Sequence, residues 1–569
     1  MIPRPAHRTA RQPHLDGGGG SHERRPGLLA DVHPSALKSG RAQAEQPNME
    51  VAANRAEGSA QARTRARRLA AKHSRHAGHR HPKPHPKRHT NAHKKHHGKH
   101  LAHGSQTPKI TPTPPPPSSA PVQSVAGPAT IAQVQRLLWR AGFGPSPGQA
   151  QALAAQPLAL VVQSLTRPSG AEVLSGPSPT NSNGGPLDPA GTWGDDHCWW
   201  LDRMVRTNQP LVERMTFIWH DWFATSNAQI NSVQLMLNQN ATLRANALGS
   251  FATLFQAVTV DPAMLVFLNG VENSVDDPNE NYGREMMELF SLGADRGAYT
   301  EDDVHEMARA LTGWRNDWSN AGRTNFRFDP ALHDATNKTV FGHTGNWTYT
   351  DAVNLCLQHP LHASFFVSKL WGYFIPTPPD EATLASLQGI YLGSNFAIQP
   401  VVEAILMHPD FHDGPELVTP PAVFNAGLLR AIGRYIDTTD WTWIGQEAGQ
   451  QLFYPPNVSG WDFAAWIDTS TLRGRWDMVN YVAGSAHIDP WPSSGPVYDP
   501  AETPAAALAA AFAFWGNPNI SDASRQCLAG FAQAAVAGAV ADWEQSPYRA
   551  MRQNALRLLI AISPDAQLS

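Results

Sequence analysis

Acidic and basic side chains gather in one segment of the chain, NENYGREMMELFSLG, which covers residues 279–293. Glu280, Arg284 and Glu288 follow each other at intervals of four, so on a helix they would share one face. Glu285 lies about one residue round that face. Two interpretations are open. The face is either a half-exposed ladder of ion pairs, or one wall of a cleft in which Arg284 keeps carboxylates ionised for a metal ion or a cationic substrate.

A second group of ionisable residues lies in FDPALHDATNKTVFG, where His333 and Asp334 are followed by Lys338. In an enzyme, His333 with Asp334 would serve as an acid/base pair or as metal ligands, and Lys338 would stabilise an anion. Glu285 or Glu288 would then be the general base or a further ligand. The residues that we consider as metal ligands are Glu288, His333, Asp334 and His220.

The evidence for a metal is weak, because the chain has no HExxH, DxDxDG or paired ExxH spacing. His220 ends an apolar stretch beside Asp221, where a core histidine is the simpler interpretation. A GxSxG turn, a phosphate-binding P-loop and a GxGxxG after a strand are also missing. This argues against an α/β-hydrolase, a nucleotide hydrolase and a dinucleotide enzyme. A carboxylate-based glycosidase or lyase stays open, since it needs only two suitably placed Asp or Glu.

The elements that would position these residues are mostly helices. TIAQVQRLLWRAGFG opens with Thr130 and Gln133 as a capping box. YTEDDVHEMARALTGW opens in the same way with Thr300 and Asp303, and NQPLVERMTFIWHDW has Asn208 as its predicted cap. Strand patterns are scarce, apart from a candidate hairpin around Phe326. The sequence therefore predicts a mainly α fold: one large multi-helix domain with long loops and at most a small hairpin.

Charge divides the chain into two parts. Residues 1–130 hold 22 of the 45 Lys and Arg but only 6 of the 48 Asp and Glu, so the remainder is acidic. Eleven histidines lie between His73 and His103 in a basic run without apolar periodicity. We predict a disordered basic, His-rich and Pro-rich tail over 1–126 and a helical body over 127–569. The tail is either simply solvated or binds anionic polymers and surfaces, or chelates metal loosely.

The three cysteines, Cys198, Cys356 and Cys527, exclude a disulfide-dense scaffold. No apolar run approaches the about 18 residues of a membrane-spanning helix. An arginine pair near the N-terminus is not followed by an apolar stretch, so no conventional export signal is visible. Retention inside the cell, a different true start and another export route are all compatible with this.

Eight segments in order resemble the bacterial domain-of-unknown-function 1800 family, over roughly Thr130 to Tyr481. They are LLWRAGFGPSP, HDWFATS, DPAMLVFL, PNENYGREMMELFSLG, YTEDDVHEMARALTGW, HDATNKTVFG, HPLHASFFVSKLW and FYPPNVSGWDFAAWIDTSTLRGR. The family pattern matches Asn279, Glu280, Asn281, Arg284, Glu285, Glu288, His333, Asp334, Lys338, Pro455, Pro456, Asn457, Gly460 and Trp461. The form HDWF departs from the family at Asp221, which weakens a ligand role for His220.

The resemblance implies a protein that is exported from bacteria or lies at their surface, and whose gene often neighbours that of a phosphatase- or sulfatase-like protein. It implies no established activity. Our leading hypothesis is a metal-assisted or carboxylate-based hydrolase of a polymer such as polysaccharide. Its acidic cleft would be built from residues 279–288, 333–338 and 455–461, and Asn281, Arg284, Asn457 and Trp461 would bind substrate. The alternative is a non-catalytic scaffold that partners the phosphatase-like protein.

Overall fold

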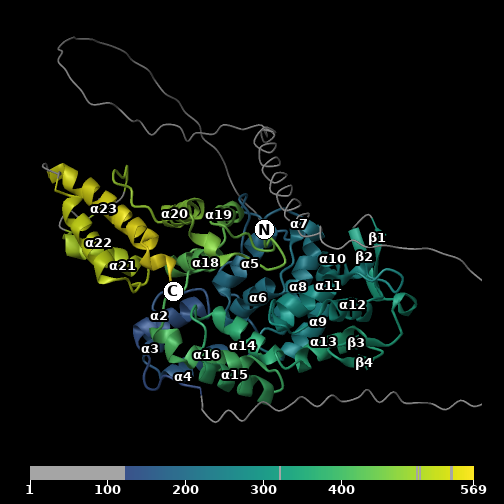
Figure 1. Cartoon of the computed structure of the whole chain (residues 1–569). Coiled ribbons are helices and arrows are strands. Elements are labelled where there is room, and N and C mark those ends of the chain that lie inside the picture. The colour runs from purple at the N-terminus through teal and green to yellow at the C-terminus, as the bar shows by residue number, and fades with distance from the viewer. Residues whose placement is uncertain (1–121, 320–321, 495–497, 499–501, 538–541) are drawn as a thin grey trace, which may run out of the picture. The chain divides into compact units, whose positions relative to one another are not determined.

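The computed structural model describes residues 122–569, apart from 320–321, 495–497, 499–501 and 538–541. This part of the chain forms 22 α-helices and two short antiparallel hairpins (Figure 1), which confirms the predicted mainly α fold. The predicted tail lies almost wholly outside the described residues. Its boundary at 126/127 and its anion binding therefore stay predictions.

The helices of the first half are α2 (Ile131–Arg140), α3 (Gln149–Ala154), α4 (Leu158–Thr166), α5 (Asp195–Arg206), α6 (Pro210–Trp222), α7 (Asn227–Ile230), α8 (Val233–Ala245), α9 (Phe251–Thr259), α10 (Pro262–Phe267), α11 (Glu280–Glu285) and α12 (Glu301–Ala310). Those of the second half are α13 (Tyr349–Gln358), α14 (His362–Gly372), α15 (Glu381–Gly393), α16 (Ile398–Met407), α17 (Pro409–Asp413), α18 (Pro421–Ile432), α19 (Trp441–Glu447), α20 (Thr469–Gly484), α21 (Pro504–Phe514), α22 (Asp522–Ala534) and α23 (Asp542–Ile562). A π-helical segment, Met286–Leu292, directly follows α11.

Helix starts follow the predicted capping chemistry in two of three cases. Thr130 and Gln133 form the capping box of α2, and Thr300 and Asp303 form that of α12. The prediction for α6 was wrong, because Gln209 occupies the cap position without a side-chain bond. Asn208 instead accepts a 2.8 Å hydrogen bond from the backbone N–H of Val173, so its polar side chain fixes a neighbouring loop.

Two hairpins interrupt the helices between α12 and α13. The predicted one pairs β1 (Trp314–Ser319) with β2 (Gly322–Phe328), with a register shift between Arg315 and Asp317. The other, β3 (Lys338–Val340) with β4 (His343–Gly345), was not predicted. Its strands are too short for a period of two to be visible in the sequence.

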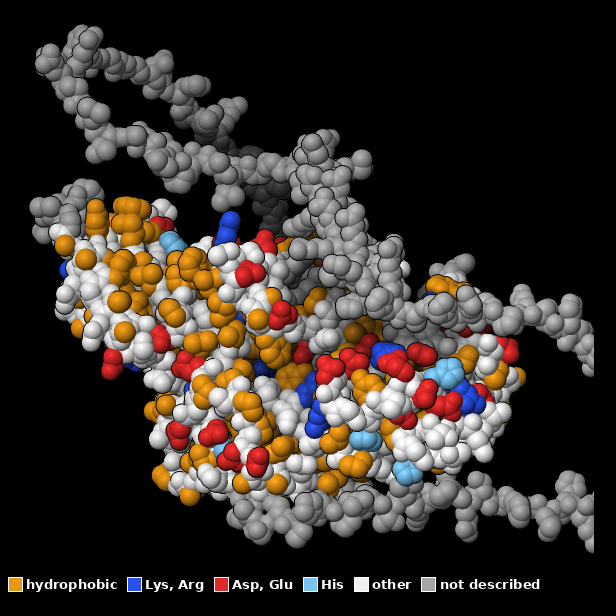
Figure 2. Space-filling view, in the orientation of Figure 1, with side chains coloured by type: hydrophobic (Ala, Val, Ile, Leu, Met, Phe, Trp, Pro, Cys, Tyr) orange, Lys and Arg blue, Asp and Glu red, His pale blue; other side chains and the backbone are white. Residues whose placement is uncertain are grey.

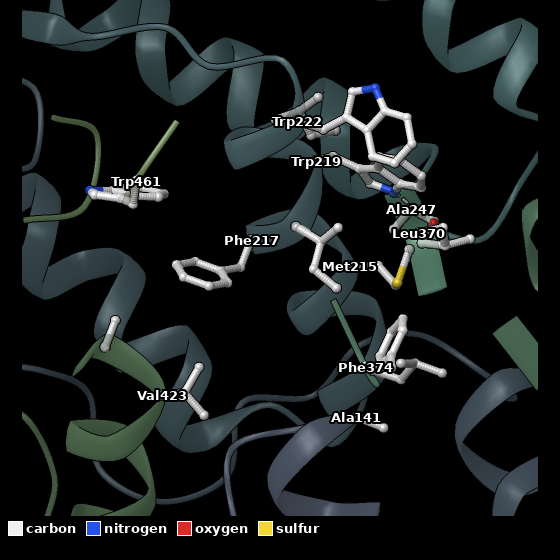
Figure 3. Packing of buried hydrophobic residues seen from close by; sticks show 14 of the residues in the cluster. Ala141, Met215, Phe217, Trp219, Trp222, Ala247, Leu370, Phe374, Val423 and Trp461 are labelled. Atoms are coloured by element: carbon white, nitrogen blue, oxygen red, sulfur yellow. Dashed lines mark hydrogen bonds between the residues drawn. The ribbon is translucent and has the colours of Figure 1, made fainter. Parts of the chain in front are cut away.

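The core surrounds α6, which packs against α4, α5 and α8. Trp219 and Trp222 of α6 lie with Met215, Leu370 and other apolar side chains in the interior that Figure 3 shows. Their indole N–H groups are bonded, Trp219 to the carbonyl of Ala247 at 2.9 Å and Trp222 to that of Phe290 at 3.1 Å. These two tryptophans thus serve the packing of the core.

The C-terminal helices α21, α22 and α23 pack together, and α23 also contacts α20 (Figure 1). α20 in turn contacts α18, which links this group to α5. Cys198, Cys356 and Cys527 are all free thiols. Among the described residues, none of the helices combines the length and the apolar character needed to cross a membrane.

Candidate functional site

The acidic segment 279–293 begins as a regular helix with a capped start. Asn279 caps this helix by accepting a 3.0 Å hydrogen bond from the backbone N–H of Asn281. Asn281 is exposed, and its side chain donates to Asn269 at 3.3 Å. The amide of Asn281, predicted to bind substrate, therefore lies at the protein surface beside another amide.

Arg284 forms the ion pairs of this segment, but its main partner lies on the next helix. Its guanidinium binds Glu301 of α12 with both Nη atoms, at 2.9 and 2.7 Å, and reaches Glu280 at 3.4 Å. Hydrogen bonding to Glu301 raises the pKa of Arg284 and lowers that of Glu301. Figure 2 shows acidic and basic side chains interspersed over the surface where α11 and α12 lie. The ion-pair interpretation describes this face.

Glu288 lies in the π-helical segment, and Glu285 directly precedes it. Glu288 accepts a 3.0 Å hydrogen bond from the hydroxyl of Tyr299. Burial, together with Glu288, raises the pKa of Tyr299 to about 12. Burial, and then the charge of Glu288, raises the pKa of the half-buried Glu285. Glu285 forms no hydrogen bond or ion pair with another described residue.

The end of the π-helical segment docks into the core through its carbonyl groups. The last four carbonyls of a helix have no helical N–H partner. Here each accepts a side-chain bond: Leu289 from Lys369 at 2.9 Å, Phe290 from Trp222 at 3.1 Å, Ser291 from His362 at 2.9 Å and Leu292 from Arg296 at 2.9 Å. Side chains of α6 and α14 thereby hold the acidic segment in place.

His333, Asp334 and Lys338 pack under α12, away from Glu285 and Glu288. Nδ1 of His333 lies 3.0 Å from the carbonyl of Thr312, while its Nε2 is buried without a partner. Burial lowers the pKa of His333, so the ring is neutral at pH 7. Lys338 is buried and donates to the carbonyl of Thr336 at 2.9 Å and to Asn346 at 3.1 Å. These bonds fix the β3–β4 hairpin.

Asp334 is the acceptor for a partly exposed arginine of α12. Nε of Arg309 donates to it at 2.7 Å, and the backbone N–H and hydroxyl of Thr336 donate at 2.8 and 2.5 Å. Burial would raise the pKa of Asp334, but these bonds outweigh it and hold the pKa well below its usual value. α12 also binds the hairpin backbone, because Glu306 accepts from the N–H of Thr339 at 2.8 Å. α12 therefore contacts both the segment 279–293, through Glu301, and the segment 333–338, through Arg309.

Asn457 and Trp461 lie against α6, in a third place. The exposed Asn457 accepts from the N–H of Ser459 at 2.8 Å and so closes a turn. Trp461 is buried and stacks on Phe217 with 5.6 Å between ring centres, as Figure 3 shows. Its backbone N–H donates to Asp221 at 2.8 Å. A Cβ at Gly460, whose φ is +88°, would lie 2.2 Å from this carboxylate, so the approach needs glycine.

His220 occupies an aromatic part of the core. Its ring centre lies 5.3 Å from that of Trp200, 5.8 Å from Phe453 and 5.6 Å from Trp461, and neither ring nitrogen has a hydrogen-bond partner. Burial lowers its pKa to about 3. Within the described part of the chain, no three His, Cys, Asp or Glu side chains lie close enough to hold a metal ion.

The predicted site residues thus fall into three separate groups. Among the described residues, no hydrogen bond, ion pair or ring contact joins Glu285 or Glu288 to His333, Asp334 or Lys338. The cavities described below are lined by none of these five side chains. Their catalytic roles stay predictions that this geometry does not support.

A model of the family described as "Protein of unknown function (DUF1800)" matches residues 136–568. The chain belongs to the DUF1800 family. The match extends well beyond Tyr481, where the resemblance seen in the sequence ends, and takes in the C-terminal helices. No curated protein and no solved structure matches the chain significantly.

The two ends of the DUF1800 match meet at a cavity of about 440 Å³, which lies within the range of ligand sites. Arg136 of α2 and Leu568 near the last residue both line it. Apolar side chains form much of its wall, namely Trp139, Phe424, Leu428, Trp515 and Ile560. Polar side chains complete it, among them Gln133, Arg136, Asp413, Glu416 and Asp565.

Trp139 enters this cavity because two glycines leave room for its ring. A Cβ at Gly427 of α18 would lie 2.1 Å from the ring, and one at Gly144 would lie 3.1 Å from it. At the rim, Arg136 donates to the carbonyl of His412. Burial lowers the pKa of Arg136, and the nearby charges of Glu416 and Asp413 oppose this. Both carboxylates are exposed and form no hydrogen bond with another described residue.

Sequence reasoning missed this site because its parts lie far apart in the chain, Arg136 and Leu568 by more than 400 residues, and none of them forms a motif. The signal that was present is Trp139 beside Arg140 in LLWRAGFG, a large aromatic on the polar side of an amphipathic helix. Arg309 and Glu301 were also missed, since charged residues on an exposed helix face are common. Lys369, the one lysine of the apolar helix α14, was a further unused signal.

Proposed function

We propose that this DUF1800 protein is an exported or surface-associated carbohydrate-binding protein whose ligand enters the α2–α18 cavity. The observation that carries the proposal is the lining of that cavity: aromatic rings with free carboxylates at the rim. Sugar rings offer apolar C–H faces that pack on aromatic side chains, and hydroxyl groups that donate to carboxylates. The acids Asp413, Glu416 and Asp565 outnumber the one cation named here, Arg136, so this lining argues against an anionic ligand.

Hydrolysis of the bound polysaccharide is the second candidate. Two carboxyl groups flanking a glycosidic bond suffice for that reaction, and Asp413 and Glu416 lie together at the cavity mouth. In this mechanism Asp413 or Glu416 would be the general base, the role that the sequence suggested for Glu285 or Glu288. Asp565 is a weaker candidate, because Ser521 and Ser524 already donate hydrogen bonds to it.

A glycan array probed with the full chain tests the proposal, followed by titration of the best glycan with tryptophan fluorescence as the readout. We expect Glu416→Gln to weaken binding by about tenfold, the loss of about 1.4 kcal/mol. Gly427→Ala should abolish binding by pushing the ring of Trp139 into the cavity. Gly372→Ala is the matched control, since a Cβ there meets nothing within 4 Å.

Three outcomes decide between the alternatives. If the Glu416→Gln and Gly427→Ala variants bind the glycan as tightly as the wild type does, the cavity is not the binding site. Release of reducing ends that is lost in Asp413→Asn or Glu416→Gln would add hydrolysis to binding. Absence of any bound glycan, together with capture of a phosphatase-like protein, would favour the scaffold alternative.

A further inference from the structure

Arg214 of α6 is a buried cation without a counter-charge. Its side chain is 3% exposed, and Nε and Nη1 are inaccessible and lack any hydrogen-bond partner. The neighbouring Glu213 cannot serve it, because both of its oxygens are occupied by Arg244 at 2.7 and 2.8 Å. A buried charge with no partner is costly, so an unpaired guanidinium here calls for an explanation.

The other buried arginines show what the usual solution is. Five arginines of the described chain are buried, and the remaining four each donate at least two hydrogen bonds: Arg140, Arg206, Arg475 and Arg552. Arg475, for example, donates to the carbonyls of Trp466 at 3.1 Å and Thr419 at 2.7 Å. Arg214 thus differs from the other buried arginines of the described chain, because it donates no hydrogen bond to another described residue.

Arg214 is one of the residues that line a small cavity. The cavity measures about 20 Å³, and one water molecule needs about 10–15 Å³ on the same scale. Phe217, Trp461, Phe463 and Trp466 form most of its wall. The cavity therefore has room for one water molecule or one monatomic ion, and it is too small for a polyatomic ligand.

The acid that shares this cavity is already engaged. Asp221 accepts hydrogen bonds from the hydroxyl of Tyr373 at 2.7 Å and from the N–H of Trp461 at 2.8 Å. It forms no ion pair with Arg214, and the charge that acts on it is that of Lys369. Arg214, Lys369 and Asp221 together leave one positive charge uncompensated. Although burial lowers the pKa of Arg214 to about 9, the group stays protonated at neutral pH.

We propose that a monovalent anion of halide size binds in this cavity and is held by the guanidinium of Arg214. A water molecule in the cavity would bring no counter-charge. A halide supplies both an acceptor and the charge. The site would stabilise the fold by mass action, because only the folded chain holds the anion in place. It is independent of the carbohydrate cavity.

The site is tested by comparing the thermal unfolding temperature of the full chain in sodium chloride or bromide with that in sodium gluconate, at constant ionic strength. The gluconate anion is too large to enter the cavity. We expect the wild type to unfold several degrees higher in the halides. Arg214→Met should lose this difference. Arg552→Met is the matched control: its partners Ala532 and Glu502 lie outside the cavity wall, so it should lower the unfolding temperature but keep the halide dependence.

Crystals grown in bromide give a direct readout that needs no variant. An anomalous peak beside Arg214 in the wild type would support the site. Its absence at high bromide would overturn the proposal and leave water as the occupant, and so would an unchanged halide increment in Arg214→Met.

Discussion

Arg284 binds Glu301, seventeen residues further along the chain, rather than Glu288, its neighbour on the predicted helix face. A π-helical segment, Met286–Leu292, begins two residues after Arg284 and contains Glu288. Glu288 accepts its hydrogen bond from Tyr299. The pair Arg284–Glu301 fastens α11 to α12, and the predicted spacing of four is realised as an ion pair between Arg284 and Glu280.

We predict that Glu301→Gln changes stability little. The carboxylate of Glu301 is 77% exposed, so water and salt screen its ion pair with Arg284. Exposed pairs of this kind contribute little to stability. Urea unfolding of the variant should give nearly the free energy of unfolding of the wild type, and any difference should shrink at high salt. A larger, salt-independent loss would show that this pair does more than fasten the surface.

Arg309→Met should destabilise the protein much more. It leaves Asp334, which is 6% exposed, without the 2.7 Å bond that balances its burial. Breaking one side of such a pair costs about 2–4 kcal/mol, allowing for the partial exposure of Arg309. Urea unfolding of Arg309→Met, Asp334→Asn and the double variant gives the coupling energy directly. Additive losses would mean that the two residues do not depend on each other.

The pH dependence of stability should report on Asp334. Its pKa in the folded chain lies well below the usual 3.8. A carboxyl group with a lowered pKa contributes stability that is fully present above pH 3.8 and is lost as the pH falls through the folded value. Asp334→Asn should therefore be less stable than the wild type at neutral pH, and the two should converge below about pH 4. Parallel curves down to pH 2 would contradict this.

Local signals in the sequence were sufficient to predict the mainly helical fold and two of the three helix starts. Thr130 with Gln133 and Thr300 with Asp303 marked helix starts, since capping depends on residues three apart. The family motifs correctly identified the chain as DUF1800. The π-helical segment was invisible, because MMELFSL has the same composition as a regular helix. Its wide turn is stabilised by tertiary bonds from Lys369, Trp222 and His362.

The arrangement of the site could not be predicted from the sequence either, because it also depends on tertiary contacts. Whether Glu288 and His333 face one cleft depends on how α12 packs between them, and that is set by Arg309 and Glu301 acting across long chain separations. The cavity lined by Trp139 needs α18 and the chain end to meet α2. A single sequence holds no information on such distant partners when each residue is of a common type.

Lys369 offers the last prediction, on the interior of the molecule. Its ammonium group lies 4.4 Å from the ring centre of Trp222 and donates to the carbonyl of Leu289. Burial lowers its pKa from 10.5 to about 8, although the charge of Asp221 opposes this. The folded chain therefore binds this proton less tightly than the unfolded chain does.

The sign of the effect follows from that difference. The cost of burying the charge is fully present below pH 8 and disappears as the pH rises toward 10.5. The stability of the wild type relative to Lys369→Met should thus rise between pH 8 and 10.5, because methionine packs against Trp222 without a charge. Urea midpoints of both proteins at pH 7.5, 9 and 10 measure it, and other groups cancel in the comparison. A constant difference across this range would show that Lys369 keeps an ordinary pKa, and that water reaches its ammonium group.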